Sequence, residues 1–107
     1  MAGEDTDATT ITTLDGNDII TTGSANDTIT SGGGADIIVA GAGDNTITSG
    51  AGDDSITVAG SGADGAGNII DAGAGNDTVT MGTGAGDDTV TLGTGDDSLV
   101  ATLTTTS

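Results

Sequence analysis

Residues 50–58, GAGDDSITV, combine two glycines, two adjacent aspartates and a short β-branched run. Close variants recur as GGGADIIVA at 32–40, GAGNDTVTM at 73–81 and GTGDDSLVA at 93–101. The 107-residue chain carries 17 acidic residues and no Lys, Arg or His, so its formal net charge is −17. The charge of the repeated carboxylates must therefore be balanced from outside the chain.

The composition limits the kind of domain that the chain can form. It has no Phe, Tyr, Trp, Pro or Cys, and 21 of its residues are glycine. Large side chains dominate core energetics and disulfides staple small domains, so the chain lacks both usual sources of stability. We therefore expect a single domain, residues 1–107, that depends on a bound metal, on assembly or on both.

Charge and side-chain chemistry exclude several classes of function. Nucleic acid and anionic membrane surfaces would repel a chain of net charge −17. No apolar run reaches membrane-spanning length, so we expect no membrane insertion. Catalysis would have to use carboxylates and hydroxyls alone, and no aromatic platform for a sugar is present. We therefore do not expect an enzyme.

An internal repeat organises the chain. Each short β-prone run has an aliphatic residue at its centre, and seven of the nine intervals between these residues are nine residues long. The remaining two intervals are 14 and 11 residues long. The central residues are Ile11, Ile20, Ile29, Ile38, Ile47, Ile56, Ile70, Val79, Val90 and Leu99.

Each unit reads as a Gly/Asp/Asn turn followed by about three extended residues. Glycine supplies the positive φ of tight turns, and Thr, Ile and Val favour strands, whose side chains alternate between inward and outward. Two units make one coil of about 18 residues. The sequence predicts an all-β, right-handed parallel β-roll or β-solenoid of about five coils with two short strands each. The repeats fill about residues 9–100, and a short strand-like tail follows at 101–107.

The units resemble the RTX (repeats-in-toxin) calcium-binding nonapeptide, G-G-x-G-x-D-x-U-x, in which U is a large aliphatic residue. The match is close at 50–56, 73–79 and 93–99 and extends over about residues 14–100. The first glycine is usually replaced, as by Leu92, Ala72 or Ala40. The resemblance implies a calcium-binding β-roll in a secreted, extracellular protein that is exported by type I secretion. The N-terminal MAGEDTDATT has no cleavable signal pattern, which is compatible with that route.

Alternate units belong to opposite sheets, so the turns sort into two columns. The motif position is aspartate throughout the first column, whereas the second reads Thr9, Asp27, Asn45, Asn68 and Asp88. Both insertions, around 59–67 and 82–86, also fall in the second column. One edge of the roll is thus predicted to be a complete aspartate ladder and the other a degraded one.

The complete ladder requires a cation. Carboxylates in successive coils would lie about 5 Å apart, and each such pair costs roughly 3 kcal/mol at an effective dielectric near 20. Ca²⁺ accepts six to eight oxygens, and glycine-rich turns expose carbonyls beside the carboxylates. We expect about four calcium sites on this edge and fewer or weaker ones on the other. The predicted ligands are Asp18, Asp36, Asp54, Asp77, Asp97, Asp27, Asp88 and Asn45, with Gly32, Gly34, Gly50, Gly52, Gly73, Gly75, Gly93 and Gly95 in the turns.

The first member of each aspartate doublet leaves two interpretations open. Asp53, Asp87 and Asp96 occupy a variable position that also accepts Asn17, Ala35 and Asn76. They could be additional ligands or simply solvated carboxylates.

The preferred function is that of a calcium-binding structural protein that assembles end to end, with itself as partner, into an extracellular filament or matrix. The strand-like ends ATTITT, 8–13, and LVATLTTTS, 99–107, lack the polar caps that normally close a solenoid. One alternative is an ice-binding protein, because four of five coils place a Thr-x-Thr pair on one outer face, as in ice-binding solenoids. Another is a calcium-responsive fragment of a secreted RTX-like adhesin or toxin.

Overall fold

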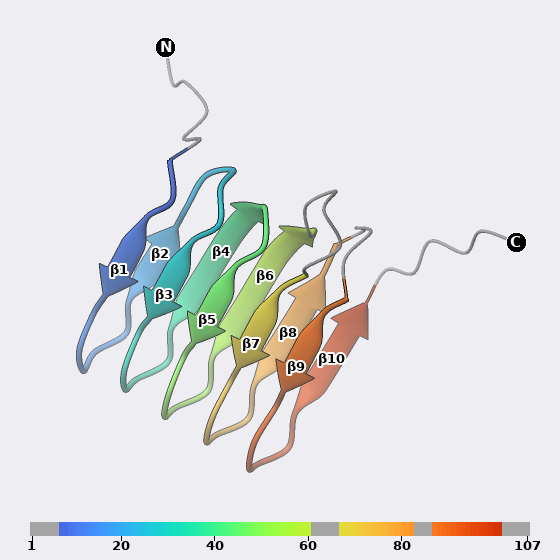
Figure 1. The fold of residues 1–107 in the computed structure, drawn as a ribbon. Helices are drawn as coiled ribbons and strands as arrows, with labels where there is room; N and C mark the ends of the chain where they lie inside the picture. Colours follow the sequence, from blue (N-terminus) through green and yellow to red (C-terminus); the bar gives the residue numbers. More distant parts are fainter. Residues whose placement is uncertain (1–6, 61–66, 83–86, 102–107) are drawn as a thin grey trace, which may run out of the picture.

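A computed structural model describes residues 7–60, 67–82 and 87–101, which form ten strands and no helix (Figure 1). No helix in these ranges could span a membrane. The strands are β1 (Thr10–Thr12), β2 (Ile19–Thr21), β3 (Thr28–Thr30), β4 (Ile37–Ala42), β5 (Thr46–Thr48), β6 (Ser55–Gly60), β7 (Ile69–Asp71), β8 (Thr78–Met81), β9 (Thr89–Thr91) and β10 (Ser98–Ala101).

Successive strands alternate between two parallel five-stranded sheets. One sheet has the order β1-β3-β5-β7-β9, and the other has the order β10-β8-β6-β4-β2. Each pair of strands therefore completes one coil of a β-solenoid, and the coils stack along the molecule (Figure 1). The predicted all-β roll is confirmed.

The register follows the nine-residue repeat. Ile29 pairs with Ile11 on one side and with Ile47 on the other, and Ile38 pairs with Ile20 and Ile56 in the second sheet. Both insertions fall between a strand of the second sheet and the next strand of the first sheet. Their middle residues, 61–66 and 83–86, lie outside the described ranges, as do residues 102–107 of the predicted tail. Pairing resumes in register beyond each insertion, with Ile70 opposite Ile47 and Val90 opposite Ile70.

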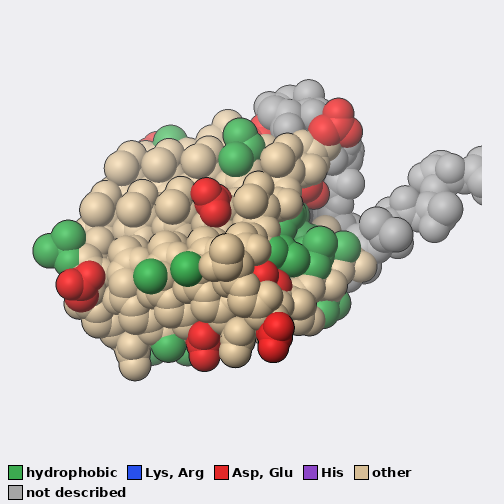
Figure 2. All heavy atoms as spheres, turned by 90° about the horizontal axis from the view of Figure 1, so that it is seen from below, with side chains coloured by type: hydrophobic (Ala, Val, Ile, Leu, Met, Phe, Trp, Pro, Cys, Tyr) green, Lys and Arg blue, Asp and Glu red, His purple; other side chains and the backbone are tan. Residues whose placement is uncertain are grey.

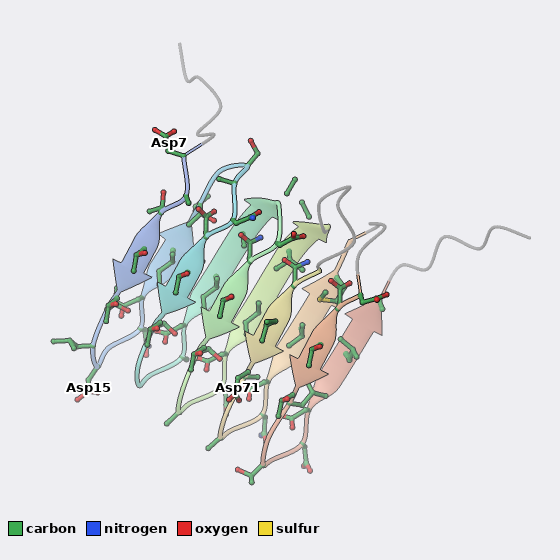
Figure 3. The ribbon with its side chains drawn as sticks, in the orientation of Figure 1. Asp7, Asp15 and Asp71 are labelled. Carbon is green, nitrogen blue, oxygen red and sulfur yellow. The ribbon has the colours of Figure 1, made fainter. Side chains whose placement is uncertain are left out.

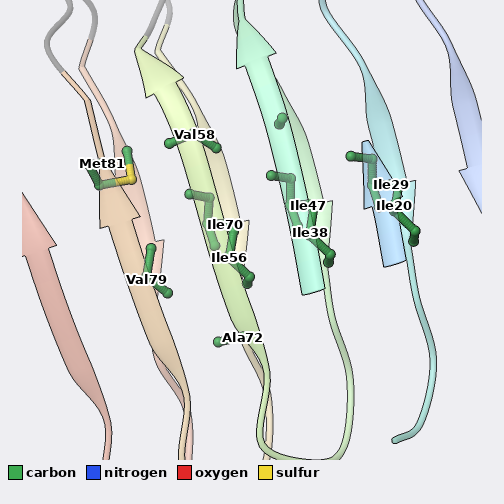
Figure 4. Packing of buried hydrophobic residues seen from close by; sticks show 11 residues of the cluster. Ile20, Ile29, Ile38, Ile47, Ile56, Val58, Ile70, Ala72, Val79 and Met81 are labelled. Atoms are coloured by element: carbon green, nitrogen blue, oxygen red, sulfur yellow. The ribbon is translucent and has the colours of Figure 1, made fainter. Parts of the chain in front are cut away.

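The core is a single layer of small aliphatic side chains between the two sheets (Figure 4). Ile38, Ile47 and Ile56 are each 0% exposed, because coils cover them on both sides. The central residue of the last described coil is less well covered than those of the interior coils. Leu99 is 47% exposed, since none of the described residues forms a coil beyond β10.

The outer faces carry the predicted side chains. Thr10, Thr28 and Thr46 align across β1, β3 and β5, but Ile69 replaces threonine in β7. Asp71 likewise interrupts the second row of threonines (Figure 3). On the other sheet, three aliphatic side chains form an exposed group: Ile19 is 76%, Ile37 46% and Val39 38% exposed, and Ile19 pairs with Ile37.

Candidate metal centre

The first edge is the row of turns that joins each odd-numbered strand to the even-numbered strand that follows it. These turns lie along the bottom of the view in Figure 1, and Figure 2 looks onto them from below. Short parallel bridges join them from coil to coil, through Asp15, Gly33, Ala51, Ala74 and Thr94. The motif aspartates end these turns, directly before the even-numbered strands, and are Asp18, Asp36, Asp54, Asp77 and Asp97.

A hydrogen-bonded ladder connects the five aspartates. The backbone N–H of Asp18 donates to Oδ1 of Asp36 at 2.8 Å, and the N–H of Asp36 donates to Oδ1 of Asp54 at 2.9 Å. The same bond, at 2.9 Å, connects Asp54 to Asp77 and Asp77 to Asp97. Each carboxylate beyond the first coil therefore uses one oxygen to satisfy the backbone of the preceding coil.

The other carboxylate oxygen, Oδ2, is buried without a hydrogen-bond donor in four of the five. These residues are Asp18, Asp36, Asp54 and Asp77. The Ser49 hydroxyl lies beside Asp54 but donates to the carbonyl of Ala72 at 2.8 Å, so it leaves Oδ2 of Asp54 without a donor. Burial of an unpaired carboxylate costs several kcal/mol unless a cation or a donor compensates it. The described part of the chain supplies neither.

Glycine carbonyls come close to the same edge. A Cβ on Gly52 would overlap the carbonyl oxygen of Gly34, and a Cβ on Gly50 would overlap that of Gly32. The Gly32 carbonyl accepts the N–H of Ala51, whereas those of Gly34 and Gly52 accept no hydrogen bond from the described residues. The predicted glycines all lie in these turns and are Gly32, Gly34, Gly50, Gly52, Gly73, Gly75, Gly93 and Gly95.

The donor set fits a hard divalent cation. Within the described ranges, no three acidic side chains are grouped closely enough to hold a metal by themselves. A cation here would therefore combine carboxylate oxygens of neighbouring coils with backbone carbonyls, which is the all-oxygen environment that Ca²⁺ prefers. Nitrogen and sulfur ligands are excluded as main contributors because the chain has no His or Cys.

The second edge, formed by the turns from even-numbered to odd-numbered strands, has the same ladder with different side chains. Thr9 N–H donates to Oδ1 of Asp27, Asp27 N–H to Oδ1 of Asn45, and Asn68 N–H to Oδ1 of Asp88, at 2.8–2.9 Å. Among the described residues of this edge, only Asp27 has a buried Oδ2 without a partner. Asp88 is exposed. The two edges therefore share one kind of ladder and differ in their buried partnerless Oδ2 atoms, which are four on the first edge and one among the described residues of the second.

The variable position has a role that neither sequence-based interpretation included. The side chain of Asn17 accepts the N–H of Ala35 at 2.8 Å, and Asp53 accepts the N–H of Asn76 at 2.8 Å. This ladder runs opposite to the aspartate ladder, because its side chains accept from the following coil. Asn76 continues it to Asp96 at 2.9 Å. Only Oδ1 is used, so asparagine and aspartate are interchangeable here, and Asp53 is an exposed ladder acceptor.

The sequence-based predictions do not include a row of buried hydroxyls at the start of the first-edge turns. Ser31 and Ser49 are both 0% exposed. The Ser31 hydroxyl donates to the Ser49 carbonyl at 2.9 Å, and that of Ser49 donates to Ala72 at 2.8 Å. The recurrence of TITS at 28–31 and 46–49 was the available signal. These bonds hold consecutive coils together at the start of the first-edge turns.

Burial raises the pKa of the Asp54 carboxyl above its ordinary value of 3.8, although the N–H of Asp36 partly opposes the shift. Burial likewise raises the pKa of Asp77, with the neighbouring charges of Asp54 and Asp97 adding to the shift. The folded state therefore holds protons that the unfolded state releases. These two carboxyls thereby contribute stability that is fully present below pH 3.8 and is lost as the pH rises through their elevated pKa values.

We expect the calcium-free protein to gain β-structure when it is acidified from pH 7 to pH 3.5, because protons then neutralise the buried carboxylates. Far-UV circular dichroism in a chelator-treated sample measures this gain. The control is the double variant Asp54→Asn/Asp77→Asn, whose β-structure should depend less steeply on pH. Equal pH dependence in both proteins would contradict the assignment to these two residues.

A family model described as the RTX calcium-binding nonapeptide repeat (4 copies) matches residues 5–38, 30–65 and 59–99. Searches of curated proteins and of solved structures found no match. The matched residues include every aspartate of both ladders.

Proposed function

Since the chain belongs to the RTX calcium-binding nonapeptide repeat family, we propose that it is a structural protein whose fold is completed by calcium and whose rolls assemble end to end outside the cell. The observation that supports calcium binding most directly is the row of partnerless Oδ2 atoms in Asp18, Asp36, Asp54 and Asp77. Withdrawal of calcium tests this part of the proposal. A β-roll that stays folded without calcium would contradict it.

The proposed ligands are the first-edge aspartates and the glycine carbonyls between them. When bound, calcium supplies positive charge to carboxylates that otherwise repel one another. The chain itself sets the spacing, because the Oδ1 ladder and the glycine turns hold one carboxylate per coil. RTX repeats are structural calcium-binding units, and this arrangement supports a structural function in preference to a catalytic one.

The two ends of the roll offer complementary backbone groups. Among the described residues, the sheets begin with β1 and β2 and end with β9 and β10, so each end of this part presents a strand edge. In the interior, an aspartate N–H donates to Oδ1 of the next coil. At a junction between two copies, the N–H of Asp97 in one copy would meet Oδ1 of Asp18 in the next. Copies joined head to tail in this way form an open filament.

Leu14 limits how closely such copies can join. The equivalent residue of every later coil is glycine, and a Cβ on Gly32, Gly50, Gly73 or Gly93 would overlap the carbonyl of the preceding coil. Leu14 is 78% exposed at the N-terminal end of the roll. A copy stacked there in the interior register would bring its Gly93 carbonyl against the Leu14 side chain. We therefore propose that the junction is looser than the spacing between interior coils.

We expect the molar mass of the wild-type particles to be higher in millimolar calcium than in EGTA. Leu14→Gly should raise the molar mass further, because it removes the side chain that obstructs the junction. Multi-angle light scattering measures both effects. The control is Ile37→Ala, which shortens an exposed aliphatic side chain of an interior strand, leaves both ends of the roll as they are and should not enlarge the particles. A wild-type protein that remains monomeric in calcium would contradict assembly, and an unchanged Leu14→Gly would contradict this junction.

The family and the outer threonine face bear on where the protein acts and on the two alternative functions. RTX repeats are typical of secreted proteins, and this supports extracellular action and export by type I secretion. The alternative of an adhesin or toxin fragment shares that location and the same calcium-binding repeats. Ice binding would depend on an even threonine surface, and Ile69 and Asp71 interrupt both threonine rows in β7. We therefore place the structural function first.

A further inference from the structure

Asn45 and Asn68, the asparagines at the motif positions of the second edge, satisfy both of their polar side-chain atoms within the protein. Oδ1 of Asn45 accepts the N–H of Asp27 at 2.9 Å, and its Nδ2 donates to the Gly41 carbonyl at 3.1 Å. Oδ1 of Asn68 accepts the N–H of Asn45 at 2.8 Å, and its Nδ2 donates to Oδ1 of Asp88 at 3.2 Å. Both side chains are buried, at 1% and 0% exposure. The amide therefore fills the place where an aspartate would leave Oδ2 without a partner.

Charge along the two edges differs in the same way. The first edge has four neighbouring carboxylate pairs, one at each step of its ladder. The motif positions of the second edge have none, because Thr9 and Asn45 flank Asp27 and Asn68 precedes Asp88. Asp44 lies in the same turn as Asn45, where its Oδ1 accepts the N–H of Gly67 at 3.1 Å. At Asn45 and Asn68 the second edge thus has neither a neighbouring pair of motif carboxylates nor a vacant acceptor that would require a cation, whereas Asp27, one ladder step away, keeps a buried Oδ2 without a partner.

We propose that Asn45 and Asn68 make the middle of the second edge independent of calcium, so that calcium holds the roll along its first edge alone at these coils. This inference rests on the proposed calcium-binding function and adds the residues that confine it to one edge. An internal amide donor replaces the ion. Hydrogen bonds within the chain, in place of calcium, thereby hold the second edge together at the coils next to the first insertion.

The substitution Asn45→Asp tests the inference, because it replaces the amide nitrogen of the side chain by a carboxylate oxygen and preserves the shape of the side chain. It creates a neighbouring carboxylate pair with Asp27 and replaces the Nδ2 donor by an acceptor. We expect the variant to bind an additional calcium ion, counted by isothermal titration calorimetry. We also expect its folding midpoint to move to higher calcium, because an unpaired buried acceptor lowers the folding equilibrium constant by roughly 5- to 160-fold. Circular dichroism during a calcium titration measures the midpoint.

Asn26→Asp is the matched control. Asn26 lies on the same edge, is exposed, and uses only Oδ1, which accepts the N–H of Asp44 at 2.9 Å. The substitution adds the same charge without a buried partnerless oxygen, so the calcium count should stay unchanged and the midpoint should move much less. A wild type that binds no calcium would refute the proposed function itself. A wild type that binds calcium, together with an Asn45→Asp variant of unchanged count and midpoint, would overturn only the inference made here.

The reverse substitution decides the matter if Asn45→Asp does not fold in calcium. Asp54→Asn removes a carboxylate from two neighbouring pairs of the first edge, those with Asp36 and Asp77. We expect it to bind fewer calcium ions than the wild type. A calcium count equal to that of the wild type would overturn the inference, because the choice between aspartate and asparagine at a ladder position would then not determine calcium binding.

Discussion

Chelation of calcium should unfold the protein almost completely. Four pairs of neighbouring carboxylates lie along the first edge, and each pair would cost roughly 3 kcal/mol at a separation of about 5 Å and an effective dielectric near 20. Small domains have only about 5–15 kcal/mol of net stability. The core here is one layer of aliphatic side chains, with no aromatic residue to add to it. The energy of metal binding is therefore expected to be folding energy.

Far-UV circular dichroism during a calcium titration measures this effect, starting from a sample in EGTA. The expected result is a disordered spectrum in EGTA and a β-rich spectrum at millimolar calcium. Magnesium at the same concentration is the control, because it has the same charge but requires a stricter octahedral geometry and releases water reluctantly. It should restore much less structure. Identical spectra in EGTA and in calcium would show that the carboxylate ladder is tolerated without an ion.

Gly52→Ala should prevent the roll from forming even in saturating calcium. Gly52 has φ +128°, and an added Cβ would overlap the carbonyl oxygen of Gly34. A side chain in this backbone region costs about 1–3 kcal/mol, and the overlap adds to that because the neighbouring backbone is held by the parallel ladder. The displaced carbonyl is also one of the proposed calcium ligands. Calcium titration by circular dichroism should show little gain of structure.

Gly16→Ala is the matched control for this substitution. Gly16 occupies the equivalent place in the first coil and has a similar φ of +134°, but a Cβ there would meet no atom within 4 Å. Its cost should be limited to the conformational part, about 1–3 kcal/mol, and the variant should still fold in calcium. The difference between the two variants measures the overlap between coils. Equal effects would show that backbone conformation alone explains the glycines.

The parts of the fold that could be predicted are those that repeat. A nine-residue interval places each central aliphatic residue opposite its equivalent two units away, because a slip of one residue would turn that side chain outward. The pairing of Ile29 with Ile47 and of Ile38 with Ile56 follows from this alone. The aspartate ladder was predictable for the same reason, since residues in register on one edge must lie next to one another. Both insertions could be assigned to the second edge because they interrupt only its spacing.

Features that depend on individual atoms could not be predicted from the spacing. Asp53 and Asp54 are identical and adjacent in sequence, yet Asp54 has a buried partnerless Oδ2 and Asp53 is an exposed acceptor of the opposite ladder. Side chains alternate in direction, so the two carboxylates meet different backbone groups. Asn45 is a similar case. Its sequence position predicts a calcium ligand, and only the structure shows that its Nδ2 donates to the Gly41 carbonyl.

The sequence by itself therefore determined the coil, its register, the edge that carries the complete row of aspartates and the absence of any internal positive charge. These properties follow from the order of residue types, and the repeat copies each of them from coil to coil. Only the tertiary structure decided which oxygen of each carboxylate is already used by the backbone and which remains buried without a partner. That distinction arises when neighbouring coils come into contact, because a hydrogen bond between residues 18 to 23 positions apart exists only after the chain has wound around itself.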